Sequence, residues 1–585
     1  MGSRPLLRGA VALLALAVPA GPGAAQEACP DPSVVASGFQ GSMAHVRFLA
    51  DDALEGREVG SPGARCAADY IAGRLEAAGL EPAGHGGSWF HTFPVPTGAR
   101  LAGENELEMS GEAYEAGKAW SPLGFSASTE VEAPLVYGGH LLSRPGHPDD
   151  DWAHTDVSGR IAVVEWGDPD APGGRSLRAA PHFKATVAAG RGAAGLVVLL
   201  PEGAELPSLE GETRDALSIP VAVVASEAAE SVRRAARDGV PGRLSTSVEP
   251  VMREARNVAA LLPGSDPERA AEYVVVGAHY DHLGWGGDGS LSPDVRAIHN
   301  GADDNASGTA ALLEIAAEMA RGPAPERSVL FLAFTGEEKG LWGSLRFVED
   351  PTVPLEDAVA MLNLDMVGRL SEDRLTVFGM ATAAEWEALV REENRALAAP
   401  MELALAPDGY GPSDHASFYA EGIPVLHFFT NTHPEYHRPE DDWDRVNADG
   451  LRRVTELAGR VARRLAGGSG TQVAALTPVE RERPTPTASQ GSRDRGYGPY
   501  LGTIPDMSPR EGSGLRLTGV REGSPAERAG LRAGDVVVTF GDAEVTDIYT
   551  YTYALREHEA GDVVRIVVER EGRRVAVQAV LGERR

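Results

Sequence analysis

Four apolar runs between residues 255 and 466 each lead into a cluster of polar side chains. EYVVVGA runs into His279 and Asp281, and SVLFLAF is followed by the pair Glu337 and Glu338. AVAMLNL ends before Asp365, and IPVLHFF leads through a short loop to THPEYHRPEDDWD. Buried-strand runs that alternate with helical patterns predict an α/β sheet. Because ligands and chemistry gather beyond the carboxyl ends of such strands, we expect the four clusters to lie together.

The segment HNGADDNASG, residues 299–308, sets Asp303 and Asp304 side by side between glycines. Gly, Asn and Asp are common turn residues, so a solvated turn is the simplest interpretation. The neighbouring clusters favour another one, because His, Asp and Glu without Cys form a donor set suited to zinc, manganese or cobalt. Two divalent ions roughly 3.5–4 Å apart need a carboxylate that bridges them. A Gly-bounded turn before the helical segment ASGTAALLEIAAEMA can present that carboxylate.

Five sequence blocks in this region resemble the signature blocks of metallopeptidase family 28. They are GAHYDHLG, NGADDNASG, FTGEEKGLWGS, NLDMVG and YHRPEDDWD, in the order typical of the family. That family includes co-catalytic dizinc bacterial aminopeptidases and glutamate carboxypeptidase II. The resemblance covers about residues 255–466 and the helical N-terminal stretch. It implies an α/β catalytic domain with the mixed sheet of the zinc exopeptidases, a phosphorylase/hydrolase-like fold.

The resemblance also implies two Zn²⁺ ions per chain, held by five side chains. One zinc would be bound by His279 and Asp365, and the other by Glu338 and His437. Asp304 would bridge the two ions.

The remaining roles follow from the same resemblance. Glu337 would be the general base, which takes a proton from a metal-bridging water and passes it to the leaving amine. Asp281 would bond His279 and fix its tautomer. Tyr436 matches a tyrosine that stabilises the oxyanion in some members. Asp303 would be structural.

Other polar side chains nearby are interpreted as loop residues or satisfied polar groups. The block GPSDHASF, with Ser413 and Asp414, is similar to a substrate-pocket block of the family, although its role is open. The histidines given the ordinary interpretation are His282, His299, His415 and His433.

Length, charge and the first thirty residues limit the class of protein. A chain of 585 residues predicts three or four domains, and a net charge of −31 argues against nucleic acid and anionic membranes as partners. Arg4 and Arg8 precede a short apolar run, and small residues suggest cleavage near Ala25, so residues 1–25 are expected to be a signal peptide. We therefore expect a secreted or periplasmic protein without a membrane span. Cys29 and Cys66 either form one disulfide or stay as two thiols, and a lipid anchor at Cys29 is weakly supported.

Composition divides the rest of the chain. Residues 26–125 are expected to be the N-terminal part of the peptidase domain, and 126–248 an inserted domain that resembles a protease-associated (PA) domain. The catalytic domain is expected at 249–466 and a Gly/Pro/Ser-rich linker at 467–495. Residues 496–585 look like a PDZ domain, because GSPAERAGLRAGDVVVTFGD is typical of bacterial PDZ modules, which add a peptide C-terminus as a strand.

These inferences lead to one prediction and three alternatives. The prediction is an exported dizinc exopeptidase that acts on peptide or protein substrates, with an aminopeptidase as the expected activity. A carboxypeptidase or dipeptidase would use the same site. A glutaminyl cyclase fits less well, because that branch works with a reduced metal set. The alternative from another class is a non-catalytic, receptor-like protein that binds peptides through its PDZ domain.

Overall fold

A computed structural model describes most of the chain between residues 29 and 582. The expected signal peptide, 1–25, lies outside the described residues, as does most of the expected linker. The described residues are 29–141, 154–167, 169, 180–209, 211, 214, 216–287, 289–290, 292, 295–407, 409–411, 413–431, 433–467, 475–479, 501–505, 514–520, 524–541, 543–545, 550–551, 554–555, 558, 562–570 and 572–582.

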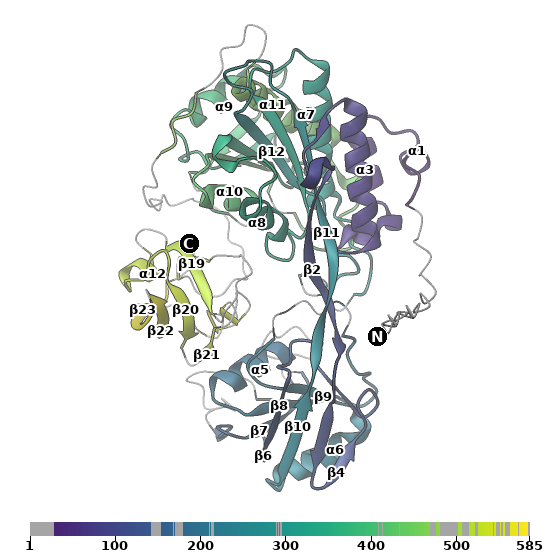
Figure 1. Cartoon of the computed structure of the whole chain (residues 1–585), viewed down its shortest axis with the longest axis vertical. Helices are drawn as coiled ribbons and strands as arrows, with labels where there is room; N and C mark the ends of the chain where they lie inside the picture. The colour runs from purple at the N-terminus through teal and green to yellow at the C-terminus, as the bar shows by residue number, and fades with distance from the viewer. Residues whose placement is uncertain are drawn as a thin grey trace, which may run out of the picture.

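The largest sheet is mixed and, within the described residues, has nine strands (Figure 1). Its order is β1-β11-β13-β12-β14-β17-β15-β16, with β2 paired to β11. The central strands β13, β12, β14 and β17 are parallel to one another. Strand β11 is antiparallel to β13, β15 is antiparallel to β17, and β16 is parallel to β15. The bounds are β1 (Glu81–Pro82), β2 (Phe90–Leu101), β11 (Val248–Leu262), β12 (Tyr273–His279), β13 (Ser328–Phe334), β14 (Ala358–Leu364), β15 (Arg374–Phe378), β16 (Glu402–Leu405) and β17 (Val425–Phe429).

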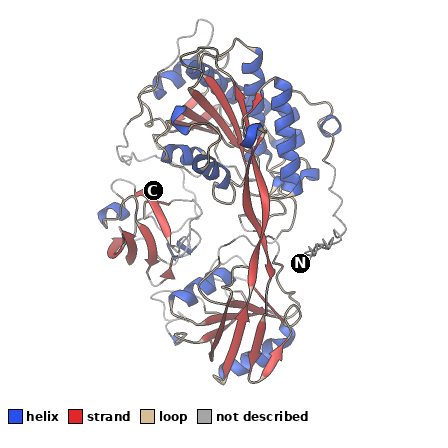
Figure 2. Ribbon diagram, in the orientation of Figure 1, coloured by secondary structure: helices blue, strands red, loops and turns tan. Residues whose placement is uncertain are grey.

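Helices cover both faces of this sheet, which explains why β12 and β13 are buried along their whole length (Figure 2). One apolar core joins the sheet to helices on its first face, and a smaller core joins it to two short helices on the other. No helix in the described part of the chain is long and apolar enough to cross a bilayer. The first face carries α2 (Ser42–Leu49), α3 (Pro62–Ala78), α7 (Gly308–Arg321), α9 (Trp386–Arg395) and α11 (Ala448–Ala466), and the second carries α8 (Trp342–Glu349) and α10 (His415–Ala420); α1 (Pro32–Val35) precedes them.

Local sequence signals fix the ends of the longest helices. In α3, Ser61 accepts a hydrogen bond from the Ala64 N–H, Pro62 occupies the first turn, and Gly79 ends the helix in the left-handed conformation. In α11, Asn447 caps the Gly450 N–H. Both helices therefore begin at a side-chain cap, and α3 also ends at a glycine.

The Cys29 and Cys66 sulfurs form a disulfide between the N-terminal segment and α3, with 5.4 Å between the Cα atoms. Of the two alternatives left open by the sequence, the structure therefore has the disulfide.

The carboxyl ends of β12, β13, β14 and β17 meet at one edge of the sheet. Strand β13 is antiparallel to β11, and Ala333 near its end pairs with Val258. Strand β11 enters the sheet from the second domain, along a two-stranded ribbon with β2 (Figure 1). The edge where the polar clusters lie therefore points along this ribbon toward the second domain.

The second domain is built on an eight-stranded sheet of the order β4-β3-β10-β6-β7-β8-β9-β5, flanked by two helices. Three of its strands precede residue 126, so the sheet begins earlier than the boundary expected from the sequence. Those strands have only three or four residues each, against about five or six in a typical strand, which gives them a weak sequence signal. The elements are β3 (Glu106–Met109), β4 (Glu112–Tyr114), β5 (Trp120–Pro122), β6 (Thr129–Tyr137), β7 (Ile161–Glu165), α5 (Pro181–Gly190), β8 (Gly195–Leu199), β9 (Val221–Val224), α6 (Ser226–Arg237) and β10 (Pro241–Thr246).

The C-terminal domain is a small antiparallel sheet with its own apolar core. It lies against the second domain, where β21 contacts α5 and Ser218 Oγ is 3.5 Å from Glu544 Oε2. Its described elements are β18 (Thr503–Pro505), β19 (Leu515–Val520), α12 (Pro525–Arg528), β20 (Val536–Phe540), β21 (Ala543–Glu544), β22 (Val563–Arg570) and β23 (Arg573–Val580).

Candidate metal centre

All five residues predicted as metal ligands come together at the carboxyl edge of the large sheet. His279 ends β12, and Asp304 lies in the helical turn η4 (Ala302–Ser307) that leads into α7. Glu338 follows β13, Asp365 follows β14, and His437 lies in the loop after β17. Each side chain is at most 15% exposed.

The first group of side chains surrounds Nε2 of His279. This atom lies 3.4 Å from Asp304 Oδ1 and 3.4 Å from Asp365 Oδ1. The other ring nitrogen faces Asp281, 3.3 Å from its carbonyl oxygen and 3.6 Å from Oδ1. Asp365 Oδ2 accepts a hydrogen bond from Ser413 Oγ at 2.6 Å. With Nδ1 turned toward an acceptor, Nε2 is free to serve as a metal ligand.

The second group surrounds Nε2 of His437, which lies 3.3 Å from Asp304 Oδ2 and 3.2 Å from Glu338 Oε2. Its Nδ1 is 2.8 Å from the Gly289 carbonyl oxygen, so this ring also turns its other nitrogen toward an acceptor. The two oxygens of Asp304 therefore face different groups. A carboxylate in this position is the shared ligand that a two-metal site requires.

His282 lies in the second group, although sequence analysis interpreted it as an ordinary loop residue. Its Nδ1 is 2.7 Å from Glu338 Oε1 and 3.9 Å from Asp304 Oδ2. His282, Asp304 and Glu338 form one triad that could hold an ion, and His279, Asp304 and Asp365 form another. The signal that could have found His282 is its place beside Asp281, three residues after His279 in the block HYDH.

The turn that carries Asp304 is held by a buried carboxylate. Asp441 Oδ2 accepts from the backbone N–H groups of Asp303 and Asp304, at 2.9 and 3.1 Å. The side chain of Asp303 turns away from the two triads: it accepts from the Gly368 N–H at 2.6 Å and lies 3.3 Å from His433 Nε2. The two adjacent aspartates therefore have different surroundings, one structural and one directed into the site.

Asn305 joins this turn to the loop that carries Asp365. Its Oδ1 accepts from the Met366 N–H at 3.1 Å and its Nδ2 donates to the Leu364 carbonyl at 2.9 Å. The two partners flank Asp365 in the chain, so one amide side chain fixes the spacing between two candidate ligands. Sequence reasoning assigned no role to Asn305 or Asp441.

The electrostatics of the site call for positive charge. Burial alone would lower the pKa of His437, but Glu338 and Asp304 raise it to about 12. Burial opposes ionisation of Glu338, yet His437 and His282 lower the pKa of its carboxyl to about 2. The carboxylates of this group thus favour positive charge beside them. The oxygen and nitrogen donor set fits zinc ions in the same places.

Glu337 differs from its neighbour Glu338. Burial raises the pKa of the Glu337 carboxyl well above its ordinary value, an effect that His279 partly opposes. Its Oε2 lies 4.0 Å from His279 Nε2, and its N–H donates to Asp281 Oδ1 at 3.2 Å. A buried carboxyl with a raised pKa, beside the ligands but in neither triad, has the properties of a general base.

Tyr436 lies against the second group. Its ring stacks on the His437 ring, with 3.8 Å between the centroids and 26° between the planes. Burial raises the pKa of its hydroxyl, which therefore keeps its proton and can donate a hydrogen bond.

A third set of side chains, His85, His91 and Asp350, also lies close enough together to hold an ion. The Thr92 N–H donates to His85 Nδ1 at 3.2 Å, and the Asn257 amide nitrogen lies 3.1 Å from His91 Nδ1. In both rings, Nδ1 therefore faces a backbone or side-chain N–H group. Metal-bound histidines usually have the opposite arrangement, so this set fits an ion poorly.

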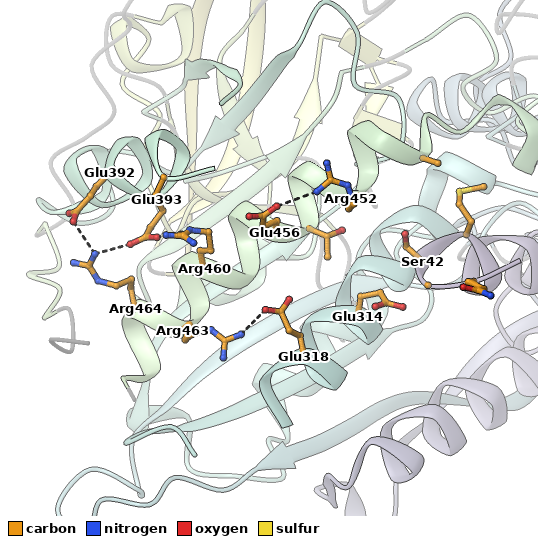
Figure 3. Close-up of a pocket in the computed structure, with 16 residues that line it drawn as sticks. Ser42, Glu314, Glu318, Glu392, Glu393, Arg452, Glu456, Arg460, Arg463 and Arg464 are labelled. Carbon is orange, nitrogen blue, oxygen red and sulfur yellow. Dashed lines mark hydrogen bonds and ion pairs between the residues drawn. The ribbon is translucent and has the colours of Figure 1, made fainter. Parts of the chain in front are cut away.

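A cavity of about 920 Å³ lies among α2, α7, α9 and α11, apart from the metal-site residues (Figure 3). Arginines of α11 line it and form ion pairs with nearby carboxylates. Arg463 lies 3.1 Å from Glu318, and Arg464 lies 2.7 Å from Glu393. Each of the four arginines that line this cavity is therefore paired with a carboxylate.

Comparisons with known proteins agree with the geometry. The sequence profile of Peptidase family M28 matches residues 257–462, and that of the PDZ domain matches residues 516–570. Aminopeptidase YwaD of Bacillus subtilis is 26% identical over 343 residues, which cover 57% of this chain and 67% of that protein. A probable lipoprotein aminopeptidase, LpqL of Mycobacterium tuberculosis, is 27% identical over 475 residues, covering 74% of this chain and 87% of the relative.

Among solved structures, BSAP, a zinc aminopeptidase from Bacillus subtilis, aligns with a TM-score of 0.47 and 22% identity, over 74% of this chain and 97% of that one. The aminopeptidase from Aneurinibacillus sp. strain AM-1 aligns with a TM-score of 0.45 and 21% identity, over 77% and 99%. The first match spans strands β12 to β17 of the large sheet and the five predicted ligands, and the second spans β20, β21 and β22 of the C-terminal sheet. Residues 257–462 are therefore similar to peptidase family M28, and residues 516–570 are similar to the PDZ domain.

Proposed function

We propose that this chain is an exported dizinc aminopeptidase that hydrolyses the first peptide bond of peptides with a free amino terminus. The observation that carries the proposal is the position of Asp304, whose two oxygens face two separate groups of buried donors. Relatives named as aminopeptidases favour cleavage at the amino end over the carboxyl end.

In the proposed site, His279 and Asp365 would hold one zinc, His437 and Glu338 would hold the other, and Asp304 would be shared. Bound zinc ions of this kind activate water at neutral pH and polarise the peptide carbonyl. His282 lies close enough to Glu338 to fix the orientation of that carboxylate.

The chain's own groups would move the proton. Glu337, with its raised pKa, accepts a proton during attack on the carbonyl and passes it to the leaving amine. Asp281 holds the His279 ring through Nδ1, which keeps Nε2 toward the metal. The Tyr436 hydroxyl keeps its proton and is available to donate to the developing oxyanion.

We also propose that residues 1–25 direct export and that 467–495 are a linker. The Cys29–Cys66 disulfide supports a secreted or periplasmic location, because disulfides persist in oxidising compartments. The second domain is proposed to be a PA domain that restricts access to the site from the edge it faces. The PDZ domain would take a peptide C-terminus as an added strand.

The activity is tested with leucine p-nitroanilide and its N-acetylated counterpart, before and after metal chelation and zinc add-back. We expect hydrolysis of the free-amine substrate alone, lost on chelation and restored by zinc. Equal cleavage of the acetylated compound would contradict an aminopeptidase. Activity that survives complete removal of metal would contradict the zinc mechanism. Absence of all cleavage, including that of carboxypeptidase substrates, would favour a receptor-like protein.

A further inference from the structure

Arg57 is a fully buried arginine that the proposed mechanism does not use. It lies at the end of the turn η1 (Asp52–Arg57), in the segment before the second domain. Its guanidinium donates to four backbone carbonyl oxygens: Nε to Tyr280 at 2.6 Å, Nη1 to Leu49 and to Asn300 at 2.7 Å, and Nη2 to Gly301 at 3.0 Å. One side chain thus joins three segments of the chain.

Two of these segments carry candidate metal ligands. Tyr280 lies between His279 and Asp281, and Gly301 begins the turn that presents Asp304. The guanidinium therefore fixes the position of the His279 end of β12 relative to the shared carboxylate.

The backbone around Arg57 is fitted closely to this place. Arg57 has a φ of 52°, a conformation that a residue with a side chain rarely adopts. A Cβ atom added to Gly56 would lie 2.4 Å from the His299 carbonyl oxygen and 2.6 Å from that of Gly284. The turn at Gly56 therefore packs between the same two loops that the guanidinium joins.

The four hydrogen-bond partners of the Arg57 guanidinium are neutral carbonyl oxygens, and none of them is a carboxylate. Burial lowers its pKa to about 10, and the nearby charges of Asp281, Asp304 and Asp441 oppose that effect. The guanidinium is therefore a fixed positive charge behind the acidic metal site.

We propose that Arg57 is a positioning residue of the metal centre, which holds the His279 loop and the Asp304 turn at the spacing that two zinc ions require. This inference rests on the proposed dizinc function. It predicts that losing the guanidinium weakens zinc binding as well as folding, whereas losing an equally buried guanidinium elsewhere weakens folding alone.

Arg453 in α11 provides the matched control. It is also buried, at 7% exposure, and its guanidinium bonds the carbonyl oxygens of Ala399 and Pro400 and the carboxylate of Asp373. None of these partners carries or flanks a predicted metal ligand. The variants R57M, R57K, R453M and R453K would be prepared metal-free, and their zinc affinity measured by competition with a chromophoric chelator. Thermal unfolding of the metal-free proteins and the kcat and KM for leucine p-nitroanilide would be measured alongside.

We expect both methionine variants to melt earlier, and only the Arg57 variants to bind zinc about tenfold to a hundredfold more weakly. At saturating zinc, R57M should lower kcat with little change in KM. R57K keeps the charge but cannot reach four carbonyls, so its zinc affinity and kcat should fall between those of the wild type and R57M. If R57M does not fold, the comparison of R57K with R453K provides the test. Wild-type zinc affinity in the Arg57 variants would overturn the positioning role. A wild-type protein that binds no zinc would instead contradict the proposed function itself.

Discussion

The adjacent residues Glu337 and Glu338 allow a sharp test, because the account gives them opposite roles. Glu338 lies between two imidazoles as a metal ligand, whereas Glu337 is in neither triad and acts as a base. Replacing each with Gln removes one charge and keeps the shape of the side chain. We expect E338Q to lose zinc from the second site, and E337Q to keep both zinc ions but lose activity.

The size of the first effect follows from the surroundings of Glu338. Burial disfavours its carboxylate, yet His437 and His282 lower its pKa from 4.5 to about 2. At about 1.4 kcal/mol for each pKa unit, the net stabilisation of the carboxylate, after the cost of burial, is about 3 kcal/mol. A dication that takes the place of the imidazole protons carries no less charge. E338Q should therefore weaken zinc binding at this site by at least about a hundredfold.

For E337Q, loss of a general base predicts a kcat about a hundredfold to ten-thousandfold lower. Zinc content and affinity would be measured by chelator competition on both variants, with the hydrolysis of leucine p-nitroanilide measured at saturating zinc. Loss of zinc from E337Q to the same degree as from E338Q would refute the division of roles. Wild-type activity in E337Q would refute the base.

Two further predictions concern stability. Replacing Cys66 with Ser removes a disulfide that closes a loop with a sequence separation of 37 residues. The free energy of unfolding should therefore fall by about 3–4 kcal/mol in the chain-entropy treatment. Reductant should then change the unfolding curve of the wild type but not that of the variant, and an equal change in both would contradict this. Burial, with a smaller contribution from His427, lowers the pKa of His415 well below its ordinary 6.5. Below pH 6.5 the unfolded chain binds a proton that the folded chain does not, so the free energy of unfolding decreases as the pH is lowered. H415L should reduce the slope of the free energy of unfolding against pH by up to about 1.4 kcal/mol per pH unit. Urea denaturation between pH 7 and 5 measures this slope, and equal slopes for the wild type and H415L would contradict this cause.

The parts of the site that sequence could predict are those whose signal is local. A buried run that ends in His279 or precedes Asp365 marks both the strand and the polar residue at its carboxyl end, and parallel pairing brings these ends together. His279, Glu338 and Asp365 meet for this reason.

The parts that sequence missed depend on partners far along the chain. Arg57 bonds carbonyls more than two hundred positions away, and Asp441 bonds the Asp303 N–H across 138 positions. Backbone carbonyls and N–H groups carry no residue signature, so nothing in the local pattern identifies these contacts. The early start of the second sheet was missed for a different reason, because β3, β4 and β5 are too short to show a strand pattern.

The central claim is that Asp304 is shared by two metal ions, and zinc stoichiometry tests it most directly. Zinc per chain would be determined by elemental analysis for the zinc-loaded wild type, for D304N and for the neighbouring control D303N, whose side chain faces the Gly368 N–H and His433 instead. We expect two zinc ions in the wild type, two in D303N, and loss of both in D304N. A single zinc in the wild type, or a D304N variant that loses only one ion, would contradict it.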